Sequence, residues 1–184
     1  TVFLAPEKLA LKASELRARG NIGVAYTYNE PLTGYEYVRD AAKIVKQYGM
    51  KNVLVTNGAF SEAVEESLLP YIDAMNVDLK GIREDYYRKL GGDLGTVQNF
   101  IKKAADRCHV ELAALIVPGE NDSREEMEEM AAWVASVNPD IPLHVNRFFP
   151  IWNMADKKAT ETEEVYRLAE TARAYLKYVF VGNC

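Results

Sequence analysis

The chain has 184 residues, a formal net charge of −5 at pH 7 and two cysteines, Cys108 and Cys184. This length suits one domain with a substantial core, so we expect residues 1–184 to form a single domain. Mixed charges without a basic stripe argue against nucleic-acid binding, and no apolar run approaches the roughly 18 residues of a membrane helix. With no secretory signal, disulfide framework or thiolate cluster, the sequence predicts a cytoplasmic chain that holds no metal ion of its own.

Short apolar runs alternate with helical patterns along the chain. The first helix is expected to begin near Pro6 and to end at Gly20. Six strand-like runs follow, separated by helical segments: Gly23–Tyr28, Asn52–Val55, Ala74–Leu79, Val110–Val117, Pro142–Phe148 and Tyr178–Val181. These runs are nearly continuous in apolar residues, which is typical of parallel strands covered on both faces. The alternation therefore predicts an α/β fold with a parallel sheet.

Capping patterns predict where several connecting helices begin. A capping box places Ser or Thr at the helix start and Glu three residues later. Three such pairs occur: Thr33 with Glu36, Ser123 with Glu126, and Thr160 with Glu163. Ser61 is expected to cap the helix after the second strand, and two shorter helical pieces are expected around Tyr86–Leu90 and Val97–Ala105.

Two architectures fit this alternation of strands and helices. An open doubly wound sheet would usually carry a Gly-x-Gly-x-x-Gly or Walker-type Gly-Lys loop, and the sequence has neither. A barrel is therefore favoured, closed or partial, because the chain is shorter than the ~250 residues of a typical eight-stranded barrel.

Polar residues follow the first two strands, and the carboxyl ends of parallel strands meet at one rim. Asn29 and Glu30 come after the first strand, where the Glu30 carboxylate could hold a ligand ammonium group or act as a general base. The alternative is a turn into a helix, whose dipole favours Glu30. Asn57 lies in Thr56-Asn57-Gly58, which turn chemistry explains equally well.

Asp78 and Lys80 follow the third strand and are separated by one residue. Alternation along a strand sends both side chains to the same side. The pair could clamp a zwitterionic amino acid, with Asp78 on the amine or on a hydroxyl and Lys80 on the carboxylate. The alternative is a partly solvated ion pair worth about 0–1 kcal/mol.

The later strands carry further candidates. The turn after Val117 could present backbone amides to a ribose or an adenine. Arg147 cannot lose its charge and needs an anionic or carbonyl partner if buried. His144 is expected to be a satisfied core residue, and the Cys108-His109 pair is assigned to structure because it lies at the start of its strand. No catalytic residue is assigned.

Six motifs in order resemble the radical S-adenosylmethionine superfamily, in particular the group similar to pyruvate formate-lyase activating enzyme that includes the radical enzyme of the AmmeMemoRadiSam system. The motifs are Tyr-Thr-Tyr-Asn-Glu-Pro, Val-Thr-Asn-Gly, Asn-Val-Asp-Leu-Lys, Ile-Val-Pro-Gly-Glu-Asn-Asp-Ser, Asn-Arg-Phe-Phe-Pro and Tyr-Val-Phe-Val-Gly-Asn. The resemblance covers essentially the whole chain. It implies a partial (β/α)6 TIM-like barrel that lacks its first strand and binds S-adenosylmethionine at the strand carboxyl ends.

The resemblance also implies roles for the rim. Asn29 and Glu30 would recognise the methionine amine, and Asn57, Asp78 and Lys80 the ribose or the methionine carboxylate. The turn after Val117 would lie near the adenine, and Arg147 is expected among the cofactor-binding residues. In the family a [4Fe-4S] cluster cleaves the cofactor reductively, and the 5′-deoxyadenosyl radical abstracts a hydrogen atom. In activating enzymes the target is a glycine of a partner protein.

Two features depart from the family pattern. The Cys-x-x-x-Cys-x-x-Cys loop that holds the cluster is absent, and Phe149 stands where relatives often have a histidine. We therefore expect an amino-terminal truncation and no radical chemistry from this polypeptide alone. Two alternatives remain open: a cluster-free barrel lyase or isomerase that uses Lys80 or Glu30, and a non-catalytic barrel that binds a nucleoside or a peptide.

Overall fold

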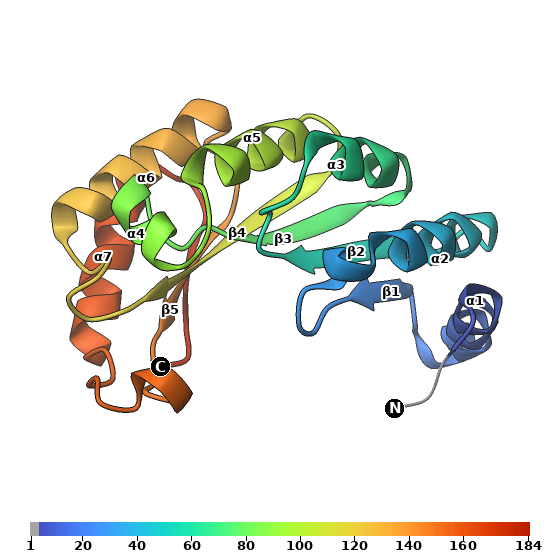
Figure 1. The fold of residues 1–184 in the computed structure, drawn as a ribbon, viewed down its shortest axis with the longest axis horizontal. Coiled ribbons are helices and arrows are strands. Elements are labelled where there is room, and N and C mark those ends of the chain that lie inside the picture. The colour runs from blue at the N-terminus through green and yellow to red at the C-terminus, as the bar shows by residue number, and fades with distance from the viewer. Residues whose placement is uncertain (1–3) are drawn as a thin grey trace.

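The computed structural model describes residues 4–184, and its centre is a six-stranded sheet. The strands are β1 Gly23–Tyr26, β2 Lys51–Thr56, β3 Ala74–Asp78, β4 His109–Ile116, β5 Leu143–Arg147 and β6 Val179–Gly182. Each strand pairs in parallel with its neighbour in the chain, and β1 and β6 form the two edges. The α/β fold is confirmed, and the sheet is an open arch, as in a partial barrel (Figure 1).

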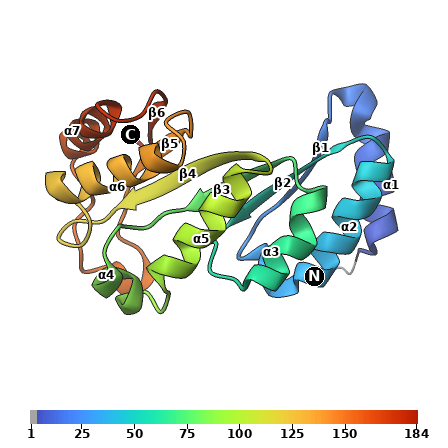
Figure 2. The same ribbon diagram turned by 90° about the horizontal axis from the view of Figure 1, so that it is seen from above.

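Seven α-helices accompany the sheet within residues 4–184. They are α1 Pro6–Glu15, α2 Tyr35–Gln47, α3 Glu62–Leu68, α4 Glu84–Lys89, α5 Leu94–Ala105, α6 Arg124–Val137 and α7 Thr162–Arg173. Short 3-10 turns occupy Leu16–Arg19, Pro31–Gly34, Leu69–Tyr71 and Trp152–Met154. Figures 1 and 2 show α2 to α7 along the outer, convex side of the arch. None of these helices is long and apolar enough to cross a bilayer.

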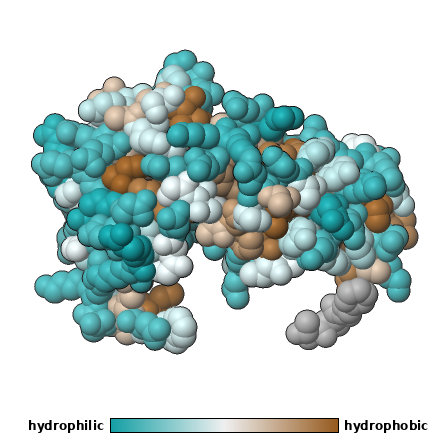
Figure 3. Space-filling view, turned by 45° about the horizontal axis from the view of Figure 1, so that its top comes forward, coloured by the Kyte–Doolittle hydropathy of each residue, from teal (hydrophilic) through white to brown (hydrophobic). Residues whose placement is uncertain are grey.

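The core lies between the sheet and these helices. On β4 the buried side chains alternate from Val110 to Ile116, whereas Glu111, Ala113 and Leu115 are at least partly exposed. The opposite, inner face of the sheet is therefore not covered by residues 4–184, and Figure 3 shows a hollow between the two ends of the arch. The expectation of cover on both faces is wrong here, because small apolar residues such as Ala113 also occupy uncovered positions.

The first capping prediction is wrong and the second is partly confirmed. Thr33 does not cap α2; instead the Glu30 carboxylate accepts from the Leu32 amide at 3.1 Å and caps the 3-10 turn before that helix. Ser123 does cap α6, since its hydroxyl accepts from the Glu126 amide at 3.2 Å. At the first position Glu30 is the capping residue in place of Thr33, because the chain makes a 3-10 turn before it enters α2.

The two remaining caps also differ from expectation, and for Thr160 the reason is a tertiary contact. Thr160 was expected to begin the last helix, but α7 begins at Thr162 and the Thr160 side chain is buried. Its hydroxyl donates to the carbonyl of Ile116 at 2.6 Å, so it ties the end of β4 to the loop before α7. Ser61 occupies the position before α3 without making a side-chain cap bond.

Candidate functional site

The carboxyl ends of the parallel strands form one rim, and every residue expected to bind a ligand lies on it. Asn29 and Glu30 follow β1, Asn57 follows β2, Asp78 ends β3 with Lys80 two residues on, Val117 follows β4 and Arg147 ends β5. Within this rim the structure brings together two small groups, Glu30 with Asn57 and Asp78 with Lys80, and leaves Arg147 apart.

Glu30 joins the end of β1 to the end of β2. Its Oε1 accepts from the Thr56 hydroxyl at 2.7 Å as well as from the Leu32 amide, and its Oε2 accepts from the Asn57 backbone amide at 2.7 Å. A carboxylate offers about four acceptor positions, so these three bonds orient Glu30 and leave room for a further donor. The Asn57 side chain accepts from the Ala59 amide at 2.9 Å and supports the same turn.

A cavity of about 690 Å³ lies beside this carboxylate. Asn29 and Glu30 line it together with Tyr26 and Tyr37. Asn29 is exposed and Glu30 is partly exposed, and both residues line this cavity. The volume is in the range of small-molecule sites.

Asp78 and Lys80 form an ion pair at the inner side of the rim. Lys80 Nζ lies 2.8 Å from Asp78 Oδ2, and the two side chains are 40% and 41% exposed. The Lys80 backbone amide donates to the hydroxyl of Tyr87 at 3.0 Å. Burial raises the pKa of Tyr87 to about 12, so this hydroxyl remains neutral. The side chains of the pair are thus open to solvent, while the Tyr87 hydroxyl fixes the backbone of Lys80.

Asn121 is a site residue that sequence reasoning did not single out. It is 1% exposed, and its side-chain amide donates to the carbonyls of Lys80 at 2.7 Å and Leu115 at 2.8 Å. Its Oδ1 accepts from the Val117 amide at 2.7 Å. The Val117 amide is therefore occupied, and Asn121 connects the turn after β4 to the Asp78–Lys80 segment. The turn residues around it signalled a loop, but nothing local signalled its partners.

Arg147 finds the carbonyl partner that its charge requires. Its Nε donates to the carbonyl of Thr160 at 2.7 Å, and its guanidinium carbon lies 4.7 Å from the centre of the Phe149 ring. Phe149 thus stacks against a cation at the position where a histidine was expected. The two residues line a cavity of about 570 Å³ with Ile151 and Trp152, two strands away from Asp78.

His144 does not lie in the core as expected. It is 31% exposed on the inner face, and its Nε2 lies 2.7 Å from Oε2 of Glu111. The alternation that places Val145 under the helices turns His144 to the uncovered side. Glu111 was not identified from the sequence, because a single polar residue in an apolar strand gives no local sign of its partner.

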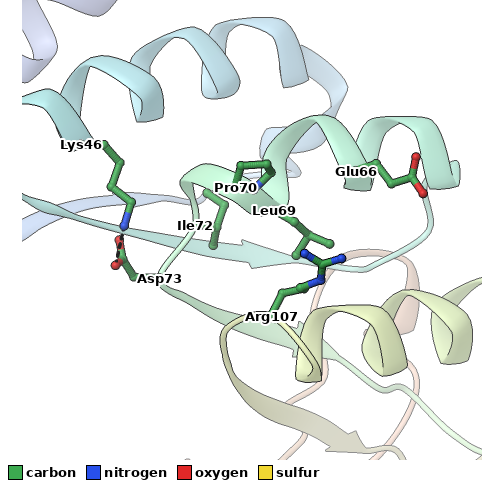
Figure 4. Close-up of a pocket in the computed structure, with 7 residues that line it drawn as sticks. All are labelled: Lys46, Glu66, Leu69, Pro70, Ile72, Asp73 and Arg107. Atoms are coloured by element: carbon green, nitrogen blue, oxygen red, sulfur yellow. Dashed lines mark hydrogen bonds and ion pairs between the residues drawn. The ribbon is translucent and has the colours of Figure 1, made fainter.

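A further cavity of about 580 Å³ lies at the opposite, amino ends of the strands (Figure 4). Asp73, just before β3, accepts from Lys46 at 2.7 Å and from Lys51 at 3.0 Å, and these bonds hold the pKa of Asp73 below its usual range against the effect of its burial. Figure 4 shows Lys46 pointing toward Asp73, whereas Arg107 lies apart from this pair. The contacts fasten loops at the end of the fold that serves stability in barrels.

The cysteines do not fit an iron–sulfur cluster. Within residues 4–184 no group of three or more His, Cys, Asp or Glu side chains is arranged to hold a metal ion. Cys108 Sγ contacts the carbonyl of Ala104 at 3.5 Å, and burial raises the pKa of Cys108 to about 11. Cys184 is exposed at the other end of the sheet. A cluster needs thiolates, so these residues do not supply one.

The fold and rim together define a parallel α/β protein with polar side chains gathered at the carboxyl ends of its strands. The family model described as "Radical SAM superfamily" matches residues 1–134. The chain therefore belongs to the radical S-adenosylmethionine superfamily, a family of enzymes.

Individual proteins resemble the chain in sequence or in fold. An uncharacterised protein of Methanocaldococcus jannaschii is 36% identical over 165 residues, which are 88% of this chain and 49% of that protein. The chain thus spans about half the length of this relative. A domain of pyruvate-formate lyase-activating enzyme from Bacteroides vulgatus has the same fold, with a TM-score of 0.73 and 17% identity over 88% of this chain and 99% of that one. Streptococcus suis SuiB bound to S-adenosylmethionine gives a TM-score of 0.80 and 15% identity over 100% of this chain and 45% of SuiB.

Proposed function

We propose that this chain binds S-adenosylmethionine along its rim, with the amino-acid portion at Asp78 and Lys80. The observation that carries the proposal is the half-exposed ion pair itself, with Nζ and Oδ2 2.8 Å apart. A zwitterionic amino acid presents the opposite charges at a similar spacing, so it can replace the internal pair by two charge-assisted bonds.

The neighbouring residues have defined tasks in this proposal. Lys80 meets the ligand carboxylate and Asp78 the ammonium group, while the unused acceptor position of Glu30 takes a further N–H donor. Asn57 and Asn29 lie beside Glu30 at the rim. The turn after Val117 and the cavity at Arg147 would receive the adenosyl portion at the other end.

The bound cofactor would supply a 5′-deoxyadenosyl group for hydrogen abstraction, chemistry that also needs a [4Fe-4S] cluster. Since the residues of this chain do not fit such a cluster, the proposal for the chain itself stops at binding. For the whole protein we propose a hydrogen-abstracting oxidoreductase similar to pyruvate formate-lyase activating enzyme, with a peptide or protein substrate. The six ordered motifs support that reading.

Calorimetry with two ligands tests the contact of Asp78 and Lys80 with the amino-acid portion, which we call the cofactor clamp. S-adenosylmethionine and 5′-methylthioadenosine share the adenosyl portion, but only the first has the amino acid. We expect the wild-type chain to prefer S-adenosylmethionine, and Asp78→Ala and Lys80→Ala each to remove most of that preference. The size of the loss should correspond to a charge-assisted bond, about 1.5–3 kcal/mol.

A matched control is the Lys177–Asp140 pair, which is exposed and far from the rim at the other end of β6. Asp140→Ala should leave the preference unchanged. An equal preference for the two ligands in the wild-type chain, or an unaltered preference in both rim variants, would remove the clamp from the proposal.

The alternative of a lyase with a Schiff-base lysine is disfavoured by the same geometry. Such a lysine must be neutral and desolvated. Lys80 is instead half exposed and paired with a carboxylate. Lys80 is therefore arranged to carry charge rather than to attack a carbonyl.

A further inference from the structure

On the inner face of the sheet, both histidines of the chain contact the carboxylate of Glu111. The sequence contains only two histidines, His109 and His144. His144 Nε2 lies 2.7 Å from Oε2 of Glu111, and His109 Nε2 lies 3.1 Å from Oε1 of the same side chain. None of these contacts involves the proposed cofactor clamp.

Glu111 determines which ring nitrogens carry protons. The hydrogen bonds from His109, and then from His144, hold the pKa of Glu111 below its usual range despite its partial burial, so it is a carboxylate at neutral pH. A carboxylate only accepts hydrogen bonds, and each neutral imidazole must therefore place its proton on Nε2. This leaves Nδ1 of His144 as an unprotonated acceptor.

The His144 ring is held in place and remains accessible. It stacks on Phe180 with the ring centres 5.4 Å apart and the planes 26° from parallel. The side chain is 31% exposed, and among residues 4–184 its Nδ1 has no hydrogen-bond partner. An oriented base that is open to solvent follows from these contacts.

The space in front of this ring is open toward the proposed cofactor clamp. In the sheet register Asp78 pairs with Ala113, and Ala113 pairs with His144. Ala113, whose side chain is a single methyl group, is thus the residue that separates Asp78 from His144 across the sheet, and the strands of these two residues are about 10 Å apart. Leu115 and Phe180, 41% and 50% exposed, border the space with apolar surface.

We propose that His144 is a general base for a substrate that lies over Ala113 on the inner face. Glu111 and His109 are its positioning residues. The substrate presents an O–H or N–H group to Nδ1 and an apolar portion to Leu115 and Phe180. The proton passes to Nδ1, the electron pair stays on the substrate oxygen or nitrogen, and the imidazolium is balanced by the Glu111 carboxylate.

Few other charges act on this base. Asp78 and Lys80 are the next titratable groups on the same face, from β3, and Arg147 ends the strand that carries His144. β6 contributes Phe180 and no titratable side chain to that face. A change in the reactivity of His144 in a Glu111 variant can therefore be assigned to the dyad.

Acylation by diethyl pyrocarbonate tests the dyad without S-adenosylmethionine. The reagent attacks unprotonated imidazole nitrogens, and mass spectrometry distinguishes the two histidine peptides. We expect His144 to react several-fold more slowly in Glu111→Gln than in the wild type. Ala113→Leu should shield His144 and leave His109 unchanged. Glu170→Gln, an exposed carboxylate on α7, is the matched control and should leave both rates unchanged.

Equal His144 rates in the wild type and in Glu111→Gln, or no shielding in Ala113→Leu, would overturn the proposal. Long-range ¹H–¹⁵N NMR of the wild-type chain at pH 8 shows which ring nitrogen of His144 is protonated, and this test does not depend on the folding of any variant. The dyad requires His144 to be protonated on Nε2, and protonation on Nδ1 would contradict it. Because no cofactor is present, failure of the cofactor clamp would leave these results untouched.

Discussion

The side-chain amide of Asn121 donates to the backbone carbonyl of Lys80 at 2.7 Å. This bond joins residues 41 positions apart and couples the turn after β4 to the ammonium group at the rim. The geometry of the proposed clamp therefore depends on a residue that need not touch the ligand.

Asn121→Leu should destabilise the protein and weaken cofactor binding together. The variant retains the volume but leaves the Lys80 and Leu115 carbonyls and the Val117 amide without their partner. With a penalty of about 1–3 kcal/mol for each buried group, and partial relaxation, we expect a loss on the order of 3 kcal/mol. Urea denaturation measures it. Asn99→Leu, at an exposed asparagine on α5 that makes no side-chain hydrogen bond within residues 4–184, should change stability little.

Gly58→Ala should be more destabilising than Gly20→Ala. Both glycines have positive φ, 67° and 88°, so both variants pay the strain of a left-handed residue, about 1–2 kcal/mol. A Cβ at position 58 would also lie 3.0 Å from Cγ1 of Val77, whereas nothing lies within 4 Å of one at position 20. The difference between the two unfolding free energies measures this crowding, and equal losses would show that the turn after β2 can relax.

Glu120→Gln should lower stability at pH 7, and this deficit should shrink as the pH falls toward 3. Glu120 contacts Lys89 at 2.6 Å and Lys157 at 3.0 Å, and these two lysines hold the pKa of Glu120 below its usual range. A carboxyl group whose pKa is lowered in the folded state stabilises the fold at pH values above the ordinary pKa of glutamate. This contribution is lost as the pH falls through the folded-state pKa. We expect on the order of 1 kcal/mol at pH 7 by denaturant titration.

The control for Glu120 is Glu128→Gln on α6, whose partner Arg124 is 64% exposed. It should produce a smaller change at pH 7, because exposed ion pairs contribute little. A Glu120→Gln deficit that persists unchanged at pH 3 would show that packing, and not charge, holds these loops together.

Glu65→Gln should stabilise the protein at pH 8 and have little effect at pH 5. Glu65 is 2% exposed on α3, its Oε1 has no partner within residues 4–184, and burial, with Glu66 adding to it, raises the pKa of Glu65 to about 7. A raised carboxyl pKa means that the fold loses stability as the pH rises from about 4.5 through 7, when the group must ionise in place.

Urea midpoints at pH 5 and pH 8 check this prediction. From pH 5 to pH 8 the wild type should lose on the order of 1–3 kcal/mol of unfolding free energy. Glu65→Gln should not show this loss. Glu66→Gln is the matched control, since its carboxylate is 65% exposed. Equal pH dependence in the wild type and in Glu65→Gln would mean that Glu65 reaches solvent when ionised.

Much of the rim could be predicted because strand alternation is a local property. Asp78 and Lys80 had to share a side, and the structure pairs them at 2.8 Å. The same reasoning located Glu30 but not its bonds to Thr56 and Asn57, which come from the neighbouring strand. The proposed binding roles of these residues await the calorimetry.

Two of the expectations that proved wrong share one cause. Thr160 has the sequence of a helix cap, yet its hydroxyl bonds to Ile116, 44 residues earlier. His144 has the sequence of a core residue, yet it faces Glu111, 33 residues earlier. In both cases a partner from another strand outcompeted the local preference.

The sequence by itself determined the order and type of the elements, the parallel sheet and the polar residues at its carboxyl ends, because periodicity and turn chemistry act over a few residues. Only the tertiary structure decided that the sheet stays open along an uncovered inner face, that Asn121 meets Lys80 and that Glu111 meets His144. Those contacts depend on the register between strands and on the curvature of the sheet. Both are set by packing across the whole sheet rather than by any one segment.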